Sequence, residues 1–376
     1  MKIDFKNPMP LYRQVSDDIK QKISSGKLEI GAQIGSHQEL ARQYDVSLIT
    51  VKKALADLIS EGILFSRVGK GTYVARKNAA VNFAQQKTIG LVLSDLKSPF
   101  FSLIVHGVEQ KASEMGCLLV LSNSSQRIEK EESQIKHFRH IGVSGLIIAS
   151  MTHVYLATPT IRKLHREKFP YVMVSYIADE DIYFVGTDHE KGAFLATAHL
   201  IKLGKKKIGY INGEEGNLLG ELRKKGYRRA LKQYEIPFNE KFVFRLPHKG
   251  EWNDFQSGYE IGKRFAKLTR RPEAVFAYND LSALGFQQAV LEAGLQVPEE
   301  IAIVGFDDID RGSYAPVPLT TVHQPTAEIG AEAVMTLIKQ IAGEPAPVRK
   351  ILQPKLVIRE SCGAATVATG EARVLV

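Results

Sequence analysis

The sequence is poor in cysteine and tryptophan and has no long apolar run. Two cysteines and one tryptophan occur among 376 residues. Nothing around the cysteines suggests a disulfide framework or a zinc site, so a reducing compartment is expected. The first five residues lack an apolar signal region, and no segment approaches the ~18 apolar residues of a membrane span. We therefore expect a cytoplasmic protein with no membrane attachment, metal or cofactor.

Acidic residues are fewer than basic ones, 41 against 50, which leaves a formal net charge of +9. This balance favours polyanionic partners, although a basic surface kept for solubility would show the same balance. The hydrophobic fraction of 44% and the charged fraction of 24% are ordinary for a globular protein. The length is sufficient for two or three domains with real cores.

Residues 1–75 show the pattern of a compact winged helix-turn-helix domain of the α+β class. Apolar residues recur every four positions from Leu11 to Ile23, which predicts a first amphipathic helix. Ser36, followed three residues later by Glu39, forms a capping box for a second helix. After a tight turn, Ser47 is expected to cap a third helix, which Gly62 ends; a glycine-rich hairpin follows between two short strands.

Two helices joined by a tight turn allow the second to lie in the DNA major groove. Hydroxyls and lysines on its outer face suit phosphates and base edges, and glycines let the hairpin backbone approach DNA closely. A three-helix packing domain with solvated lysines is the alternative, and it explains the turn, cap and basic hairpin less well. The predicted DNA-contacting residues are Ser36, His37, Gln38, Ser47, Leu48, Thr50, Lys52, Lys53, Arg67, Lys70 and Gly71.

Residues 8–75 resemble the winged helix of the GntR family. The resemblance is carried by residues 10–15, 39–41, 46–62 and 69–74. It implies binding to operator DNA. Gly35 stands where the family usually has proline, and Leu48 stands where it usually has arginine after the recognition-helix serine. The operator sequence of relatives therefore cannot be transferred to this chain.

A polar segment, residues 76–87, is expected to act as a linker. From residue 88 to 361 buried-strand runs alternate with helical patterns, which predicts an α/β domain of two lobes, each with a parallel sheet. Residues 362–376, rich in Ala, Thr and Gly, are expected to be a disordered tail. The predicted strands are residues 89–93, 117–121, 145–149, 171–174, 208–211, 274–277 and 301–304.

Short polar residues follow several of these strands, where ligands bind in open α/β sheets. These residues come in adjacent pairs, whose carboxylates and amides can hydrogen-bond to neighbouring hydroxyls of a polyhydroxylated ligand. Aromatic side chains could stack on the apolar face of a sugar ring. For any single aspartate a helix N-cap is the commoner explanation, and only the convergence of several strand ends favours binding. The pairs are Ser94-Asp95, Ser122-Asn123, Asn279-Asp280 and Asp307-Asp308.

Residues 88–361 resemble the effector domain of the LacI/GalR family, which is similar to type I periplasmic sugar-binding proteins. The resemblance is carried by residues 192–211, 223–227, 277–285 and 304–325. The family's hinge helix has no counterpart in residues 76–87. The fusion of the two domain types resembles the bacterial arabinose repressor subgroup. The effector-binding residues that the resemblance implies are Phe100, Phe101, Arg223, Trp252, Asn279, Asp307 and Gln324.

These patterns predict a homodimeric transcription factor, a repressor released from double-stranded operator DNA by a monosaccharide bound between the lobes. One alternative is a sugar-binding protein with a vestigial N-terminal module, and another is a regulator that responds to a nucleoside or purine. An enzyme ranks lowest, because no nucleophile–base pair stands at motif spacing. Asp307 and Asp308 are adjacent, and a regular strand directs successive side chains to opposite faces.

Overall fold

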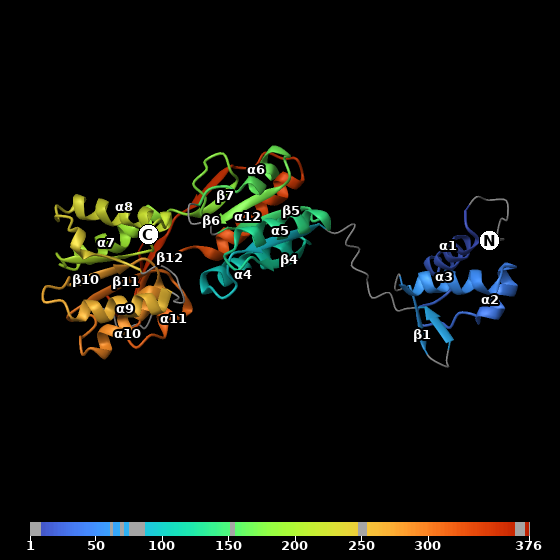
Figure 1. Ribbon diagram of the computed structural model, residues 1–376, viewed down its shortest axis with the longest axis horizontal. Helices are drawn as coiled ribbons and strands as arrows, with labels where there is room; N and C mark the ends of the chain where they lie inside the picture. Colours follow the sequence, from blue (N-terminus) through green and yellow to red (C-terminus); the bar gives the residue numbers. More distant parts are fainter. Residues whose placement is uncertain are drawn as a thin grey trace. The chain divides into compact units, whose positions relative to one another are not determined.

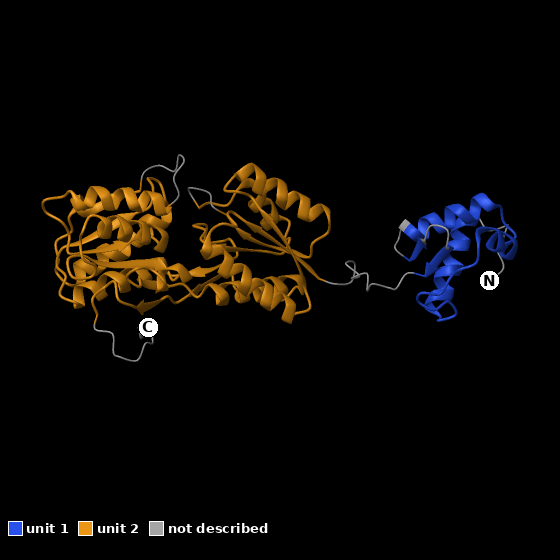
Figure 2. Ribbon diagram, turned by 90° about the horizontal axis from the view of Figure 1, so that it is seen from below, with its two compact units in different colours: residues 1–86 blue, residues 87–376 orange. Residues whose placement is uncertain are grey.

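The computed structural model describes residues 9–60, 63–67, 71–74, 87–150, 155–246, 254–364 and 373–375. The chain divides into two compact units, residues 1–86 and 87–376, which we call the N-terminal and C-terminal units (Figure 2). The segment expected to be a linker lies outside the described residues except for Lys87. Within the described ranges, no helix has the length and apolar character needed to cross a membrane.

The N-terminal unit is a winged helix-turn-helix, as predicted (Figure 1). Its β1 and β2 pair antiparallel, with Leu64 opposite Val74. Val51, Ala54, Leu55 and Leu58 are at most 1% exposed, and they form the inner face of the third helix. The described elements are α1 (Leu11–Ser24), α2 (His37–Tyr44), α3 (Leu48–Ser60), β1 (Leu64–Arg67) and β2 (Gly71–Val74).

The first lobe of the C-terminal unit is built on a six-stranded sheet in which every neighbouring pair is parallel. Buried side chains form one core on each face of this sheet. Its strands, in spatial order, are β13 (Arg349–Leu352), β7 (Phe184–Thr187), β6 (Tyr171–Ser175), β5 (Gly145–Ala149), β3 (Thr88–Leu93) and β4 (Leu118–Asn123). Its helices are α4 (Pro99–Glu114), α5 (Ile128–His140), α6 (Pro159–Arg166) and α12 (Thr326–Ile341).

The second lobe has a seven-stranded sheet with a core on each face. In β10, Ala274 and Phe276 enter one core while Val275 and Ala277 enter the other, as the two-residue period of a strand requires. Its strands, in spatial order, are β15 (Arg373–Leu375), β14 (Lys355–Ile358), β12 (Thr320–His323), β11 (Ala302–Asp307), β10 (Ala274–Ala277), β8 (Ile208–Asn212) and β9 (Val243–Arg245). Its helices are α7 (His189–Lys202), α8 (Leu218–Gln233), α9 (Asp254–Ala266), α10 (Asp280–Glu292), the short α11 (Asp310–Ser313) and the 3₁₀ turn η1 (Glu240–Phe242).

The chain passes between the two lobes three times within the described residues. The passages are β7 to α7, β12 to α12, and β13 to β14. Helix α12 follows a strand of the second lobe, yet its Ile329, Ala333 and Leu337 are buried in the core of the first lobe. Neither lobe is therefore a continuous piece of sequence. Short connections between two lobes are typical places for hinge motion.

The two-lobed α/β prediction is confirmed, with two corrections. The second sheet is not wholly parallel, because β14 pairs antiparallel with both β12 and β15. The expectation of a disordered tail from residue 362 is wrong for Cys362, which is fully buried in the second lobe's core, and for β15. Short edge strands of three or four residues carry too few apolar positions to stand out in a sequence.

Asp18 holds α1 to α2 through a buried polar contact. Its Oδ2 accepts a hydrogen bond from the Tyr44 hydroxyl at 2.7 Å and lies 2.8 Å from the Lys22 ammonium. Burial alone would raise the pKa of Asp18, but the hydrogen bonds from Lys22 and Tyr44 lower it to about 2. The charged carboxylate is therefore the form that the folded domain stabilises.

Asp18→Asn should destabilise the N-terminal unit above about pH 4 by up to about 2 kcal/mol. The pKa of Asp18 is about 2 in the folded protein and 3.8 in the unfolded chain. The charged carboxylate therefore stabilises the fold above pH 3.8, and this stabilisation is lost as the pH falls through about 2. Wild type and variant should therefore converge towards pH 2 in urea unfolding followed by circular dichroism. The exposed neighbour Asp17 provides the control Asp17→Asn. Wild-type and Asp18→Asn curves that stay parallel across this range would contradict the prediction.

Candidate functional site

The start of α2 presents three of the predicted DNA-contacting residues. Ser36 caps the helix: its hydroxyl accepts from the Glu39 amide at 3.2 Å, while the Ser36 amide donates to Glu39 Oε2 at 2.7 Å. The reciprocal bonds satisfy two amides that the helix leaves unpaired. Ser36, His37 and Gln38 are all exposed on this first turn.

Helix α3 begins with a second serine cap. The Ser47 hydroxyl accepts from the Thr50 amide at 3.2 Å and lies 2.8 Å from the Thr50 hydroxyl. Lys52 and Lys53 are exposed one turn further on, and the Lys53 ammonium lies 4.2 Å from the centroid of the Tyr12 ring. This surface carries positive charge and hydroxyls, as a phosphate-contacting helix requires.

Two apolar residues also stand on this turn. Leu48, which was predicted, is 39% exposed, and Ile49, which the sequence analysis missed, is 79% exposed. In the hairpin, Gly71 has a φ of +106°, a backbone conformation that residues other than glycine rarely adopt. Lys70 lies outside the described residues, and Arg67 ends β1 with its side chain outside them.

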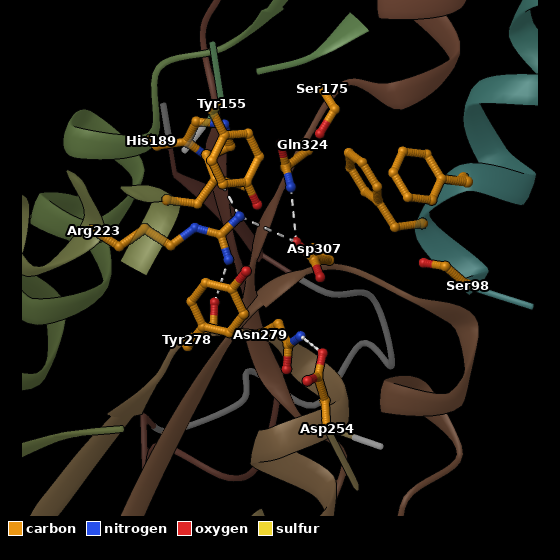
Figure 3. Close-up of a pocket in the computed structure, with 13 residues that line it drawn as sticks. Ser98, Tyr155, Ser175, His189, Arg223, Asp254, Tyr278, Asn279, Asp307 and Gln324 are labelled. Carbon is orange, nitrogen blue, oxygen red and sulfur yellow. Dashed lines mark hydrogen bonds and ion pairs between the residues drawn. The ribbon is translucent and has the colours of Figure 1, made fainter. Parts of the chain in front are cut away.

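A cavity in the C-terminal unit brings together residues from both lobes (Figure 3). The space between its lining residues is about 510 Å³, counting the part open to solvent at its mouth. Six of the seven predicted effector residues line it, whereas Trp252 lies outside the described residues. The lining residues are Ser98, Phe100, Phe101, Tyr155, Ser175, His189, Leu219, Arg223, Asp254, Tyr278, Asn279, Asp307 and Gln324.

Close packing of α8 on α7 places Arg223. A Cβ on Gly226 would lie 2.1 Å from the carbonyl oxygen of Glu190, so only glycine allows the two helices to approach this closely. The next residue, Tyr227, is buried and donates to the carbonyl oxygen of Ile208 at 2.8 Å. Anchored in this way, α8 presents Arg223 towards Asp307 (Figure 3).

The Arg223 guanidinium is almost completely buried, at 3% exposure. It donates to the carbonyl oxygen of Tyr278, and its Nη2 lies 3.7 Å from Asp307 Oδ1. Its central carbon is 3.7 Å from the centroid of the Phe306 ring. A carboxylate and an aromatic face together stabilise a charge that burial would otherwise penalise strongly.

Asp307 faces the cavity because the backbone turns sharply at the end of β11. Asp307 and Asp308 have φ values of +126° and +61°, and positive φ is uncommon for residues other than glycine. The turn separates the two carboxylates: Asp307 accepts from Gln324 Nε2 at 2.7 Å, whereas Asp308 accepts from Arg359 Nη2 at 2.7 Å. Burial raises the pKa of Asp307, and the charge of Arg223 opposes that rise.

Asn279 and Asp280, the polar pair after β10, also make different contacts. Asn279 caps α10 by accepting from the Ser282 amide at 2.9 Å, and its Nδ2 donates to Asp254 Oδ2 at 2.7 Å beside the cavity. Asp280 is fully buried and instead accepts from the Thr321 hydroxyl at 2.5 Å and the Ile309 amide at 2.9 Å. Asn279 therefore lines the cavity, while Asp280 holds the loop after β11.

The residues that follow β3 and β4 do not line the cavity, which corrects the expectation for two of the four pairs. Asp95 accepts from the Lys97 amide at 2.8 Å, and the Ser122 hydroxyl donates to Gln134 Oε1 at 3.0 Å. These side chains are occupied by local turns and a neighbouring helix. The first lobe contributes the start of α4 and the end of β6 instead.

Sequence reasoning missed His189, Asp254 and Tyr155. Burial, followed by the charge of Arg223, lowers the pKa of His189 well below its ordinary value, so the imidazole is neutral. Its Nδ1 lies 3.4 Å from Arg223 Nη2. Tyr155, 3% exposed, comes from the first lobe yet packs in a core of the second. None of the three lies in a motif that would have marked it.

A winged helix joined to a two-lobed ligand domain defines a DNA-binding transcriptional regulator. Residues 11–74 match the family described as bacterial regulatory proteins, gntR family, and residues 197–362 match the periplasmic binding protein-like domain. The chain is 32% identical to the arabinose metabolism transcriptional repressor of Geobacillus stearothermophilus, over 94% of this chain and 98% of that protein. It belongs to this family of gntR-type regulators with a periplasmic-binding-protein-like domain.

The C-terminal unit has further relatives. The repressor PurR of Haemophilus influenzae (strain PittEE) is 29% identical over 73% of this chain and 81% of its own length. The crystal structure of a LacI family regulator from Enterococcus faecium with bound ribose has a TM-score of 0.63 and 30% identity, covering 73% of this chain and 98% of that one. These matches agree with the two-lobed fold described above.

Asp280→Ala should lower the free energy of unfolding by roughly 2–4 kcal/mol, because it leaves the Ile309 amide and the Thr321 hydroxyl buried without a partner. Urea unfolding followed by circular dichroism measures the loss. Asp310→Ala removes an exposed carboxylate three residues after Asp307 and should change stability little. Equal unfolding midpoints for the two variants would show that Asp280 does not hold the β11 loop.

Proposed function

We propose that this regulator represses carbohydrate-utilisation genes and is released from its operator by a monosaccharide that binds between the two lobes. The observation that carries the proposal is the cavity itself, in which polar groups of the second lobe face the phenylalanines of α4. The similarity to an arabinose metabolism repressor and to a ribose-bound regulator supports a pentose as the ligand.

The donors and acceptors of the cavity suit vicinal hydroxyls. Asp254, Asp307 and the Asn279 and Gln324 amides provide pairs of acceptors and donors, and Phe100 and Phe101 provide apolar faces. Two carboxylates line the cavity beside one guanidinium, and that guanidinium already contacts Asp307 and Tyr278. The charge balance favours a neutral polyol over a phosphate or carboxylate ligand.

Binding would act on DNA affinity through the arrangement of the lobes. A ligand that contacts both lobes stabilises the lobe arrangement in which all of its contacts form. It shifts the equilibrium between the two lobe arrangements only by the difference in its affinity for them. We propose a homodimer acting in the cytoplasm, so that two winged helices meet a two-fold symmetric operator. A change in lobe arrangement would then alter the separation of the two DNA modules.

A purine-responsive regulator is the second candidate, favoured by the similarity to PurR and by the aromatic lining of the cavity. We infer that the cavity binds its ligand without converting it. Among the described lining residues, the hydroxyls of Ser98 and Ser175 make no hydrogen bond to the His189 ring, so no activated nucleophile faces the ligand.

Arg223→Ala should shift the effector response to much higher ligand concentrations and leave operator affinity intact. Losing a buried guanidinium leaves its partners unpaired, which we expect to weaken effector binding by roughly 10- to 100-fold. Fluorescence anisotropy of a labelled upstream fragment, titrated with arabinose, ribose, adenosine and hypoxanthine, measures both properties. Arg228→Ala, an exposed arginine on the same helix, is the matched control. An unchanged response in Arg223→Ala would refute the site, and a wild-type protein released only by purines would favour the second candidate.

Lys52→Ala should weaken DNA binding while sparing effector affinity. Loss of one phosphate contact should reduce the slope of log affinity against log salt by about 1. The slope is obtained from anisotropy titrations at several salt concentrations. Lys136→Ala, an exposed lysine of the C-terminal unit, serves as the control. If Lys52→Ala keeps the wild-type slope and affinity, this lysine does not contact DNA.

A further inference from the structure

The first turn of α3 exposes apolar surface where the helix would meet bases. Ile49 is 79% exposed and Leu48 is 39% exposed. Ile49 shares the outer face of the helix with Lys52, Lys53 and Ala56, which follow it at the three-, four- and seven-residue spacing of one helix face and are all exposed. The inner face is already filled, since Val51 and Leu58 are fully buried. Ile49 therefore takes no part in the domain's core.

The polar groups of the same turn are occupied locally. The Ser47 hydroxyl caps the helix through the Thr50 amide and contacts the Thr50 hydroxyl at 2.8 Å. Leu48 stands where the GntR pattern has arginine, so the bidentate donor that reads guanine is absent at this position. Two branched aliphatic side chains remain as the groups that project from the tip of the helix.

We propose that Ile49 and Leu48 read thymine through its C5 methyl group in the major groove. That methyl is the one apolar feature by which base pairs differ there, and aliphatic side chains contact it favourably. The surface is continuous with Lys52 and Lys53, which are placed to hold the helix against phosphates. The inference rests on DNA binding by the N-terminal unit and adds the base preference: this operator has thymines at the positions that the first turn of α3 faces.

Replacement of thymine by deoxyuridine tests the contact, because it removes the methyl and keeps the hydrogen-bonding groups. The full-length protein is first used to select its half-site from a random duplex pool. Single thymines of that site are then replaced, and dissociation constants are measured by anisotropy. One or two replacements should weaken wild-type binding about 4-fold, the equivalent of one buried methyl-sized group at about 0.8 kcal/mol. In Ile49→Ala or Leu48→Ala the penalty at the matching thymine should disappear.

Ile59→Ala is the matched control, since Ile59 is an exposed isoleucine near the other end of the same helix, at 38% exposure. It should keep the wild-type thymine profile. Leu48→Arg should enrich guanine in the selection where wild type enriches thymine. Deoxyuridine replacements that are harmless throughout the wild-type site, or penalties that persist in both alanine variants, would overturn the proposal. A protein that enriches no sequence and binds no duplex would contradict specific DNA binding itself.

Discussion

The buried guanidinium of Arg223 is the group on which the ligand domain depends most. It lies over the Phe306 ring, contacts the Asp307 carboxylate and donates to the backbone after β10. A charge so deeply buried is tolerable only when all of these contacts form together. The contact therefore ties α8, β10 and β11 into one rigid wall. A ligand bound as we propose would meet that wall already assembled and would lose little freedom in binding to it.

Backbone geometry determines which polar side chains of this wall line the cavity and which make contacts inside the fold. Two adjacent aspartates with positive φ send one carboxylate to the cavity and the other to Arg359. The same division occurs at Asn279 and Asp280, where one residue lines the cavity and the other is fully buried. Sites of unusual backbone conformation often coincide with function, because the surrounding structure must overcome the local cost.

The two units present different kinds of binding surface. The N-terminal unit presents lysines, capped hydroxyls and a few exposed aliphatic groups on a small helical scaffold, which suits a polyanion with an apolar feature at particular positions. The C-terminal unit gathers polar groups in a cavity lined by both lobes, which the described residues join by three connections. This arrangement suits a small ligand that changes the arrangement of the lobes. Such a pairing permits the sensor to regulate the DNA-binding unit without sharing a core with it.

Local signals in the sequence were enough for the helices of the N-terminal unit and for the seven predicted strands of the C-terminal unit, but not for its other strands. The Ser36 capping box and the buried run at 89–93 depend on neighbouring residues alone, so both could be predicted. Arg223 and Asp307 were found through motifs, yet their roles as ligand contacts remain predictions. The place of His189 in the cavity could not be predicted, because its contact with Arg223 joins residues that are distant in sequence. Val51, Leu55 and Leu58 recur at the spacing of one helix face, so their burial could be predicted from the sequence. Ile49 lies off that face, and only the packed structure shows that 79% of its surface is exposed.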